Sequence, residues 1–232
     1  ESVHSKTYVN HEVTIEKLDE IKKFLEKAEI NDVVVLFVAG HGVLDDNFDY
    51  YFASYDMDFE DPARRGIPYG KIEALLDGIT ALKKLLFIDT CHSGELDKEE
   101  IEVTNDEEEN GDLIFRRVGR TVGIKENPLG LKSTNELMRS LFTDLRRGTG
   151  ATVISSSGGA EYSIEGGAFQ NGLFTYCMIN GLKNREADLN KDKEIHVSEL
   201  QIYVQEEVTK LSGGRQTPTS RIQNSELDYR LW

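Results

Sequence analysis

A cysteine and a histidine each follow an apolar stretch that has the composition of a buried strand. Residues 85–88, all apolar, lead through Asp-Thr into Cys91, and Val33–Val38 lead through Ala-Gly into His41. The carboxyl ends of neighbouring parallel strands meet at one crevice of an α/β sheet, so we expect Cys91 and His41 to lie together. An imidazole beside a thiol accepts its proton, and the resulting thiolate is a strong nucleophile. The pair therefore predicts nucleophilic attack on a carbonyl group.

The glycines on both sides of His41 would let a substrate carbonyl approach the backbone closely. The N–H groups of Gly42 and Cys91 are the expected hydrogen-bond donors to the developing oxyanion. Taken singly, Cys91 could be an inert buried thiol, and His41 could be a histidine whose hydrogen bonds are made within a turn. Two strand ends with matching chemistry favour the catalytic interpretation.

Three blocks of the sequence carry a family resemblance: Ala39-Gly40-His41-Gly42, Asp89-Thr90-Cys91-His92-Ser93-Gly94, and residues 155–162 leading to Gly172-Leu173-Phe174-Thr175-Tyr176. They resemble the caspase-like cysteine peptidases, most closely the metacaspase and bacterial caspase-homologue branch. The histidine stands about 50 residues before the cysteine, a spacing associated with caspases. The likeness extends from about residue 7 to residue 218. It implies a cysteine endopeptidase that acts on a protein or peptide substrate, with Cys91 as nucleophile and His41 as acid and base.

Composition is that of one ordinary globular domain over residues 1–232. The chain is 38% hydrophobic and contains no run of 18 apolar residues, so we expect a sizeable core and no membrane segment. The start, Glu1 to His4, is polar and unlike a signal peptide. A net charge of −15 argues against nucleic acid as a partner.

The chain has two cysteines, which is too few for a disulfide framework. Cys177 lies in an apolar helical stretch and is interpreted as a core residue. This cysteine usage predicts a reducing, cytoplasmic location.

Apolar runs alternate with helical patterns along the chain. Strands are predicted over Val33–Val38, Tyr50–Ser54, Leu85–Ile88 and Thr152–Ser155. Helices are predicted over Ile15–Ala28, Tyr69–Leu76, Thr134–Leu145, Leu173–Leu182 and Val197–Leu211. The expected fold is α/β, a caspase-like sandwich with a largely parallel central sheet covered by helices on both faces.

An acidic segment follows the cysteine motif. Between Glu95 and Asp112 ten acidic residues stand against one lysine, which predicts a solvated linker. In the resembling family, a segment at this place separates a large from a small catalytic part and is often cut by the enzyme itself. We therefore expect a large part over 1–95, a processing loop over 96–135 and a small part over 136–232, with the cut after Arg116, Arg117 or Arg120. A charged loop that is never cut is the alternative.

The relatives begin with a buried strand and a helix that precede the segment matching Lys6 to Glu12. A sheet without that strand would leave backbone N–H and C=O groups unpaired. We expect the strand to come from an N-terminal fragment or from a separate regulatory domain or protein.

Substrate preference depends on Asp89. In the resemblance, the residue two before the nucleophile lines the pocket for the side chain preceding the cut bond, and Ala39 and Ser156 belong to the same substrate-binding region. Metacaspases carry an aspartate there and cut after arginine or lysine; a carboxylate pairs well with a guanidinium and repels acidic side chains. We expect cleavage after Arg or Lys. The alternatives are a caspase-like preference for acidic or small residues, and a scaffold that binds partners without turnover.

A twelve-residue segment matches the spacing of a calcium loop, although the peptidase chemistry itself requires no cofactor. The candidate ligands are Asp188, Asn190, Asp192, Glu194 through its carbonyl, and Glu199. Lys193 stands where a glycine is expected and would strain the turn. The alternative role is to cap the helix that begins near Ser198. A second place for calcium, implied by the resemblance, would use Asp56, Asp58 and Asp97.

Overall fold

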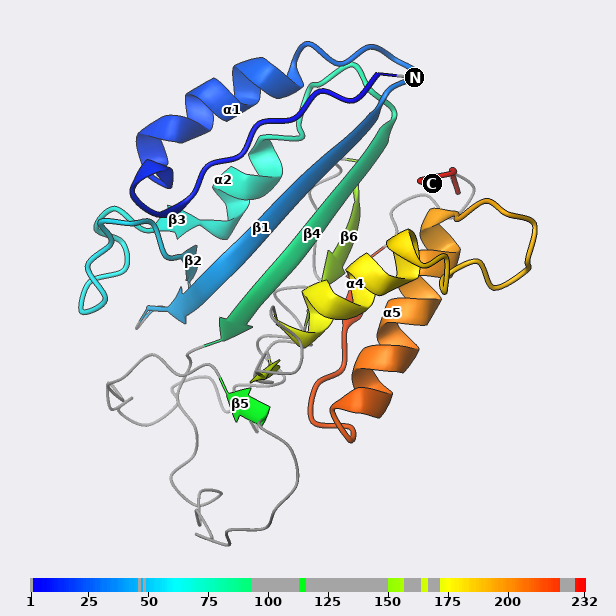
Figure 1. The fold of residues 1–232 in the computed structure, drawn as a ribbon. Helices are drawn as coiled ribbons and strands as arrows, with labels where there is room; N and C mark the ends of the chain where they lie inside the picture. The colour runs from blue at the N-terminus through cyan, green and yellow to red at the C-terminus, as the bar shows by residue number, and fades with distance from the viewer. Residues whose placement is uncertain are drawn as a thin grey trace, which may run out of the picture.

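The computed structural model describes residues 2–45, 47, 49–92, 113–115, 150–156, 164–166, 172–221 and 228–232, and of residues 44, 91, 92, 113–115 and 164–166 it describes the backbone. The helix predicted over 134–145 and most of the predicted processing loop lie outside these residues. The described chain builds a six-stranded sheet in the order β3-β2-β1-β4-β6-β8 (Figure 1). A separate two-stranded sheet pairs β5 (Leu113–Phe115) with β7 (Ile164–Gly166).

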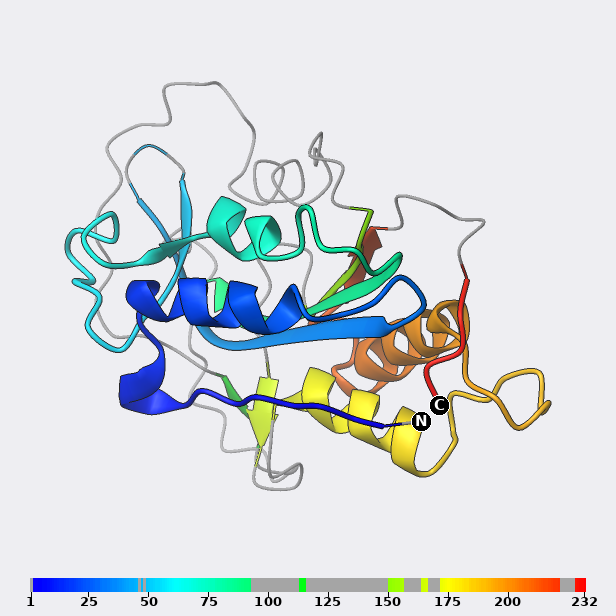
Figure 2. The same ribbon diagram turned by 90° about the horizontal axis from the view of Figure 1, so that it is seen from above.

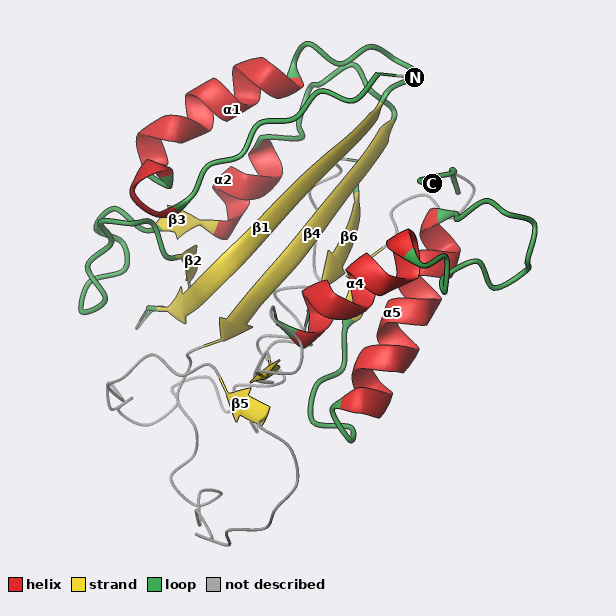
Figure 3. Ribbon diagram, in the orientation of Figure 1, coloured by secondary structure: helices red, strands yellow, loops and turns green. Residues whose placement is uncertain are grey.

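The three central strands run parallel. They are β1 (Val33–Leu44), β4 (Lys83–His92) and β6 (Thr152–Ser155). Shorter antiparallel strands lie at both sides: β2 (Tyr50–Phe52), β3 (Ile67–Pro68) and β8 (Thr219–Arg221). The arrowheads of β1 and β4 therefore meet at one end of the sheet (Figure 3). Since β4 and β6 come from the predicted large and small parts, one sheet joins both parts.

Side chains alternate between the two faces of the sheet, and each face has its own apolar core. On one face Val34, Leu86 and Val153 pack with residues of α1 (Leu18–Leu25) and α2 (Tyr69–Ala74). On the other face Leu85 and Ile154 pack with α4 (Leu173–Lys183) and α5 (Val197–Leu211). Figure 2 shows α1 and α4 on opposite sides of β1. The α/β class with helices on both faces is confirmed.

The predicted helices differ from the observed ones mainly at their ends. The helix expected from Ile15 begins with a 3-10 turn (Ile15–Lys17), and α1 ends at Leu25. Another 3-10 turn, Asn10–Glu12, precedes it. The helix predicted over Val197–Leu211 is confirmed at both ends. None of the described helices is both long and apolar enough to cross a membrane.

One face of β1 stays open along much of its length. Val33, Val35 and Phe37 are between 40% and 49% exposed, whereas the alternate residues Val34, Leu36 and Val38 contact the core under α1. On its outer edge β1 pairs with β2 only from Gly42 onward. Within the described chain, no strand pairs with the outer edge of residues 33–40.

Candidate active site

The parallel ladder of β1 and β4 places the histidine and the cysteine side by side. It runs in register from Val33 opposite Lys83 to Gly42 opposite His92, and it pairs His41 with Cys91. Neighbouring strands are separated by about 4.8 Å, so the two residues start from adjacent points of the backbone. The sequence predicted that both residues would follow a strand. They lie instead within the last residues of β1 and β4, because the pairing continues through Gly40 and Gly42. Gly40 has a φ of +150°, a conformation that favours glycine.

A hydrogen bond at His41 shows which way the neighbouring peptide groups of β1 face. The N–H group of Ala53 donates to the carbonyl of His41 at 2.9 Å, so His41 directs its peptide groups toward β2. Successive residues of a strand direct theirs to opposite sides, so Gly42 directs its own toward β4. The Gly42 N–H group thus faces β4 within the ladder of these two strands, and its role as an oxyanion donor stays a prediction.

Asp89 precedes the cysteine by two residues and is buried, with 2% of its surface exposed. Its carboxylate accepts a hydrogen bond from the hydroxyl of Thr175, in the first turn of α4. Its register partner on β1 is Ala39, which is exposed. The sequence had not singled out Thr175 as a partner of Asp89, because 86 residues separate the two positions.

Ser156 follows β6 and is fully buried. Its N–H group donates to the carbonyl of Ile88 at 2.8 Å, and its hydroxyl donates to the carbonyl of Thr90 at 3.2 Å. Its own carbonyl accepts the side-chain amide of the fully buried Gln216 at 2.8 Å. Ser156 therefore lies beside the expected substrate site, and its hydroxyl binds the strand that carries the nucleophile.

The family comparison agrees with this arrangement of strands. The profile of the caspase domain family, Peptidase_C14, matches residues 6–227. The chain belongs to the caspase domain family. This is a family of cysteine peptidases, which are hydrolases. The caspase domain is also similar in fold to the crystal structure of protein GSU0716 from Geobacter sulfurreducens, with a TM-score of 0.56 and 21% identity over 93% of this chain and 76% of that one. A comparison with curated proteins found no match.

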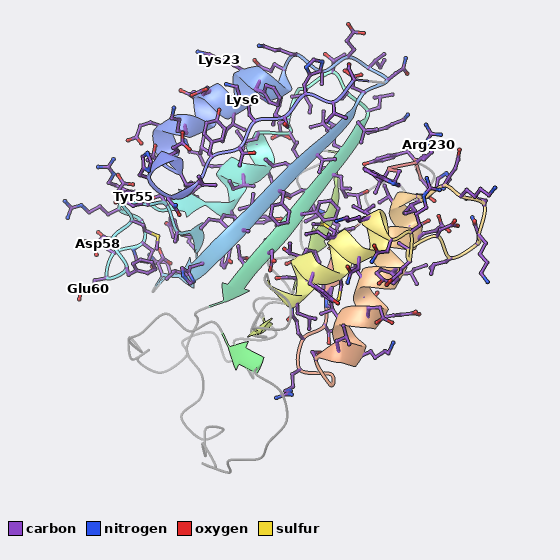
Figure 4. All side chains as sticks on the ribbon, viewed as in Figure 1. Lys6, Lys23, Tyr55, Asp58, Glu60 and Arg230 are labelled. Carbon is purple, nitrogen blue, oxygen red and sulfur yellow. The ribbon has the colours of Figure 1, made fainter. Side chains whose placement is uncertain are left out.

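The three arginines predicted to precede a processing cut, Arg116, Arg117 and Arg120, lie outside the described residues, as does Asp97. The other two carboxylates of the second calcium candidate have cationic partners. Asp56 forms an ion pair with Arg65, and Asp58 lies 3.8 Å from a guanidinium nitrogen of Arg64. Arg230 contacts Glu194 of the first calcium candidate. Asp58, in the loop after β2, lies at the opposite side of the caspase domain from Arg230 (Figure 4).

In the twelve-residue loop the carboxylates accept the loop's own backbone N–H groups. Asp188 accepts from Asp192 and Lys193 at 3.1 and 3.0 Å. Lys193 has a φ of +73°, which confirms the strained turn expected there. Among the described residues, no three His, Cys, Asp or Glu side chains are arranged to hold a metal ion. The hydrogen bonds of the loop agree with the helix-capping alternative, and the calcium site stays a prediction.

Glu199 closes this loop against the start of α5. Its two carboxylate oxygens accept three backbone N–H groups, those of Leu189 at 3.1 Å, Asn190 at 3.2 Å and His196 at 3.0 Å. The residue is buried, with 8% of its surface exposed. Removing the carboxylate would leave these donors without their acceptor.

We expect Glu199→Ala to lower the free energy of unfolding by about 3 kcal/mol, because hydrogen bonds to a charged group contribute roughly 1.5–3 kcal/mol each and their loss leaves unpaired donors. Urea unfolding followed by circular dichroism measures the change. Glu194→Ala is the matched control: Glu194 pairs with Arg230 at 3.0 Å on the exposed surface, and its loss should cost less than about 1 kcal/mol. Equal effects of the two variants would contradict the capping role.

Cys177, the second cysteine, belongs to α4 and is buried in the core, with 2% of its surface exposed. Burial raises the pKa of its thiol to about 12. At pH 8 the thiolate fraction is then only about one in ten thousand, too small for ready alkylation. We expect iodoacetamide at pH 8 to leave Cys177 unmodified in the native protein and to label it after addition of urea. Peptide mass mapping of the Cys91→Ala variant measures this, and rapid labelling without urea would show the core interpretation to be wrong.

Proposed function

We propose that this caspase domain is a cysteine endopeptidase with a Cys91–His41 dyad, of the metacaspase or bacterial caspase-homologue branch. The observation that carries the proposal is the register of β1 and β4, which makes His41 and Cys91 neighbours where both strands end. Cys91 attacks the peptide carbonyl after giving its proton to His41, and the N–H groups of Gly42 and Cys91 bind the oxyanion. His41 then protonates the leaving amine. It next activates the water that hydrolyses the acyl-enzyme.

The proposed substrate is a protein or peptide with arginine or lysine before the cut bond. Asp89 supports this preference, because a buried carboxylate two residues before the nucleophile favours a cationic side chain over an acidic one. The exposed Ala39 beside it leaves room for the entering side chain. Ser156 holds the strand that carries Asp89 through its hydrogen bonds to the carbonyls of Ile88 and Thr90.

Matched fluorogenic peptides ending in Arg, Lys or Asp test the function, assayed with and without calcium for the wild type and for Cys91→Ala. We expect turnover of the Arg and Lys peptides by the wild type alone. Turnover of the Asp peptide would retain the dyad and contradict the basic preference. A lack of turnover with every peptide would favour the scaffold alternative. Equal turnover with and without calcium would agree with a peptidase that needs no cofactor.

We also propose that the chain processes itself in the segment over residues 96–135, after Arg116, Arg117 or Arg120. The arginines directly follow the acidic run and carry the side chain that the proposed pocket accepts. Intact mass measured during incubation should reveal two fragments whose boundary follows one of the three arginines. The Cys91→Ala control should stay intact; fragments that form equally in both proteins would indicate a contaminating protease.

The proposed partner is a polypeptide segment that adds a strand to β1. The apolar residues Val33, Val35 and Phe37 are exposed, and in the described chain the outer edge of residues 33–40 has no paired strand. An exposed edge and an apolar face together favour strand addition by a further N-terminal fragment or by a regulatory domain or protein. Slower amide exchange of residues 33–40 when the segment is bound would test this. No nucleic-acid or membrane partner is proposed, and the proposed location is the reducing cytoplasm.

A further inference from the structure

Tyr50 connects the two strands that carry the catalytic pair, although it belongs to neither. It begins β2, which is separated from β4 by β1 in the sheet. Its hydroxyl nevertheless lies 2.9 Å from the hydroxyl of Thr90, the residue before Cys91. The side chain crosses β1 at Gly42, the residue after His41, where any Cβ atom would overlap the Tyr50 hydroxyl. Tyr50 thus contacts the chain next to both catalytic residues.

The surroundings of this contact hold the Tyr50 ring in place and exclude water. Tyr50 is buried in the core under α1, and Thr90 is fully buried. The ring packs edge-on against Phe52, with centroids 5.2 Å apart, and against Tyr69, with centroids 6.5 Å apart. A hydrogen bond in such a site is strong, so removing either hydroxyl should be costly.

Thr90 is held from a second direction as well. Its carbonyl accepts the hydroxyl of Ser156, which follows β6 on the other side of β4. The residue before the nucleophile is therefore fixed by one bond from Tyr50 and another from Ser156. Of these two bonds, only the one from Tyr50 also crosses β1, the strand that carries His41.

We infer that Tyr50 is a positioning residue, whose hydroxyl fixes the ends of β1 and β4 so that His41 and Cys91 keep their mutual geometry. The inference rests on the proposed function, since it concerns the same dyad. A misplacement of about 1 Å can cost about 100-fold in rate, so loss of this single hydroxyl should lower kcat by about 10-fold or more while KM changes little. The imidazole would also stabilise the thiolate less well, so the pH midpoint of Cys91 alkylation should rise toward about 8.5, the value of a free thiol.

The experiment compares four single variants and one double variant by kcat, KM and the pH dependence of Cys91 alkylation with iodoacetamide. Tyr50→Phe and Thr90→Val each remove one partner of the hydrogen bond, and Thr90→Ser keeps the hydroxyl. Tyr69→Phe is the matched control, because it removes a partly buried hydroxyl of the same ring cluster that donates to Glu73 at 3.2 Å instead. We expect similar losses for Tyr50→Phe and Thr90→Val, no further loss when they are combined, and values within about 2-fold of the wild type for Thr90→Ser and Tyr69→Phe.

Equal losses in Tyr50→Phe and Tyr69→Phe, or an unchanged alkylation midpoint in Tyr50→Phe, would overturn the inference. The alkylation readout needs no substrate, so it separates this inference from the peptidase proposal. A wild type that cleaves no peptide, but whose Cys91 midpoint rises in Tyr50→Phe, would refute the peptidase and support the positioning role. Peptide turnover that is unchanged in Tyr50→Phe would support the peptidase and refute the positioning role. A wild-type midpoint already near 8.5 would count against both.

Discussion

Replacing His41 by alanine is expected to lower kcat for peptide hydrolysis by about ten-thousand-fold, equivalent to roughly 5.5 kcal/mol of activation free energy. His41 is the register partner of Cys91 and supplies both proton transfers of the proposed mechanism. Without the imidazole, Cys91 would ionise only near the reference thiol pKa of about 8.5, and no group would protonate the leaving amine. The measurement is steady-state hydrolysis of the best Arg or Lys peptide.

The pH profile distinguishes loss of the base from loss of the fold. An imidazolium neighbour lowers the pKa of a thiol, so the wild type should reach full activity below pH 8. The residual activity of His41→Ala should instead keep rising as pH passes about 8.5, where the thiol loses its proton unaided. His11→Ala is the control, since His11 lies in a 3-10 turn outside the ladder of β1 and β4 and packs against Tyr55. If His11→Ala and His41→Ala lost activity alike, the assigned role of His41 would be wrong.

The ends of the central strands could be predicted because their signals are local. The apolar runs before residues 39 and 89 identify buried strands, and the parallel pairing of such strands brings their carboxyl ends together. The same reasoning works for β6 and α5, whose observed bounds match the predicted ones. It does not work for β3 and β8, two of the short outer strands. The pair Ile67–Pro68 contains a proline, and Thr219–Arg221 has no apolar alternation; both pair only because a longer strand offers a free edge.

The interior of the site could not be predicted in the same way. Tyr50 and Thr90, like Thr175 and Asp89, meet through tertiary packing across 40 and 86 residues of sequence. Gly42 illustrates the limit well. Its glycine was explained by the close approach of a substrate carbonyl, yet the fold requires a glycine there for another reason, since the Tyr50 hydroxyl occupies the space of a Cβ atom. A motif can therefore identify a position correctly while the reason for its residue type lies in a contact that is distant in sequence.

Replacing Asp89 by asparagine is expected to lower kcat/KM for Arg and Lys peptides by about 100-fold or more. The substitution keeps the size of the side chain and an oxygen that can accept the Thr175 hydroxyl, but it removes the charge. Truncating the charge of a buried pair with a guanidinium typically costs about 2–5 kcal/mol of binding free energy. The loss should fall on basic substrates and not on the thiol, so the rate of Cys91 alkylation should change by less than about 3-fold.

A structural role of Asp89 predicts a different pattern. If the carboxylate served only to hold the first turn of α4 through Thr175, Thr175→Val would impair peptide hydrolysis as much as Asp89→Asn does. Both variants would then lose Arg peptides and neutral peptides in the same proportion. A pocket role instead makes Asp89→Asn selective: the preference for Arg over a neutral residue of similar length, such as glutamine, should fall by about 100-fold in Asp89→Asn and by only a few-fold in Thr175→Val. The ratio of the two kcat/KM values, measured in each variant, therefore assigns the buried carboxylate either to the substrate or to the fold.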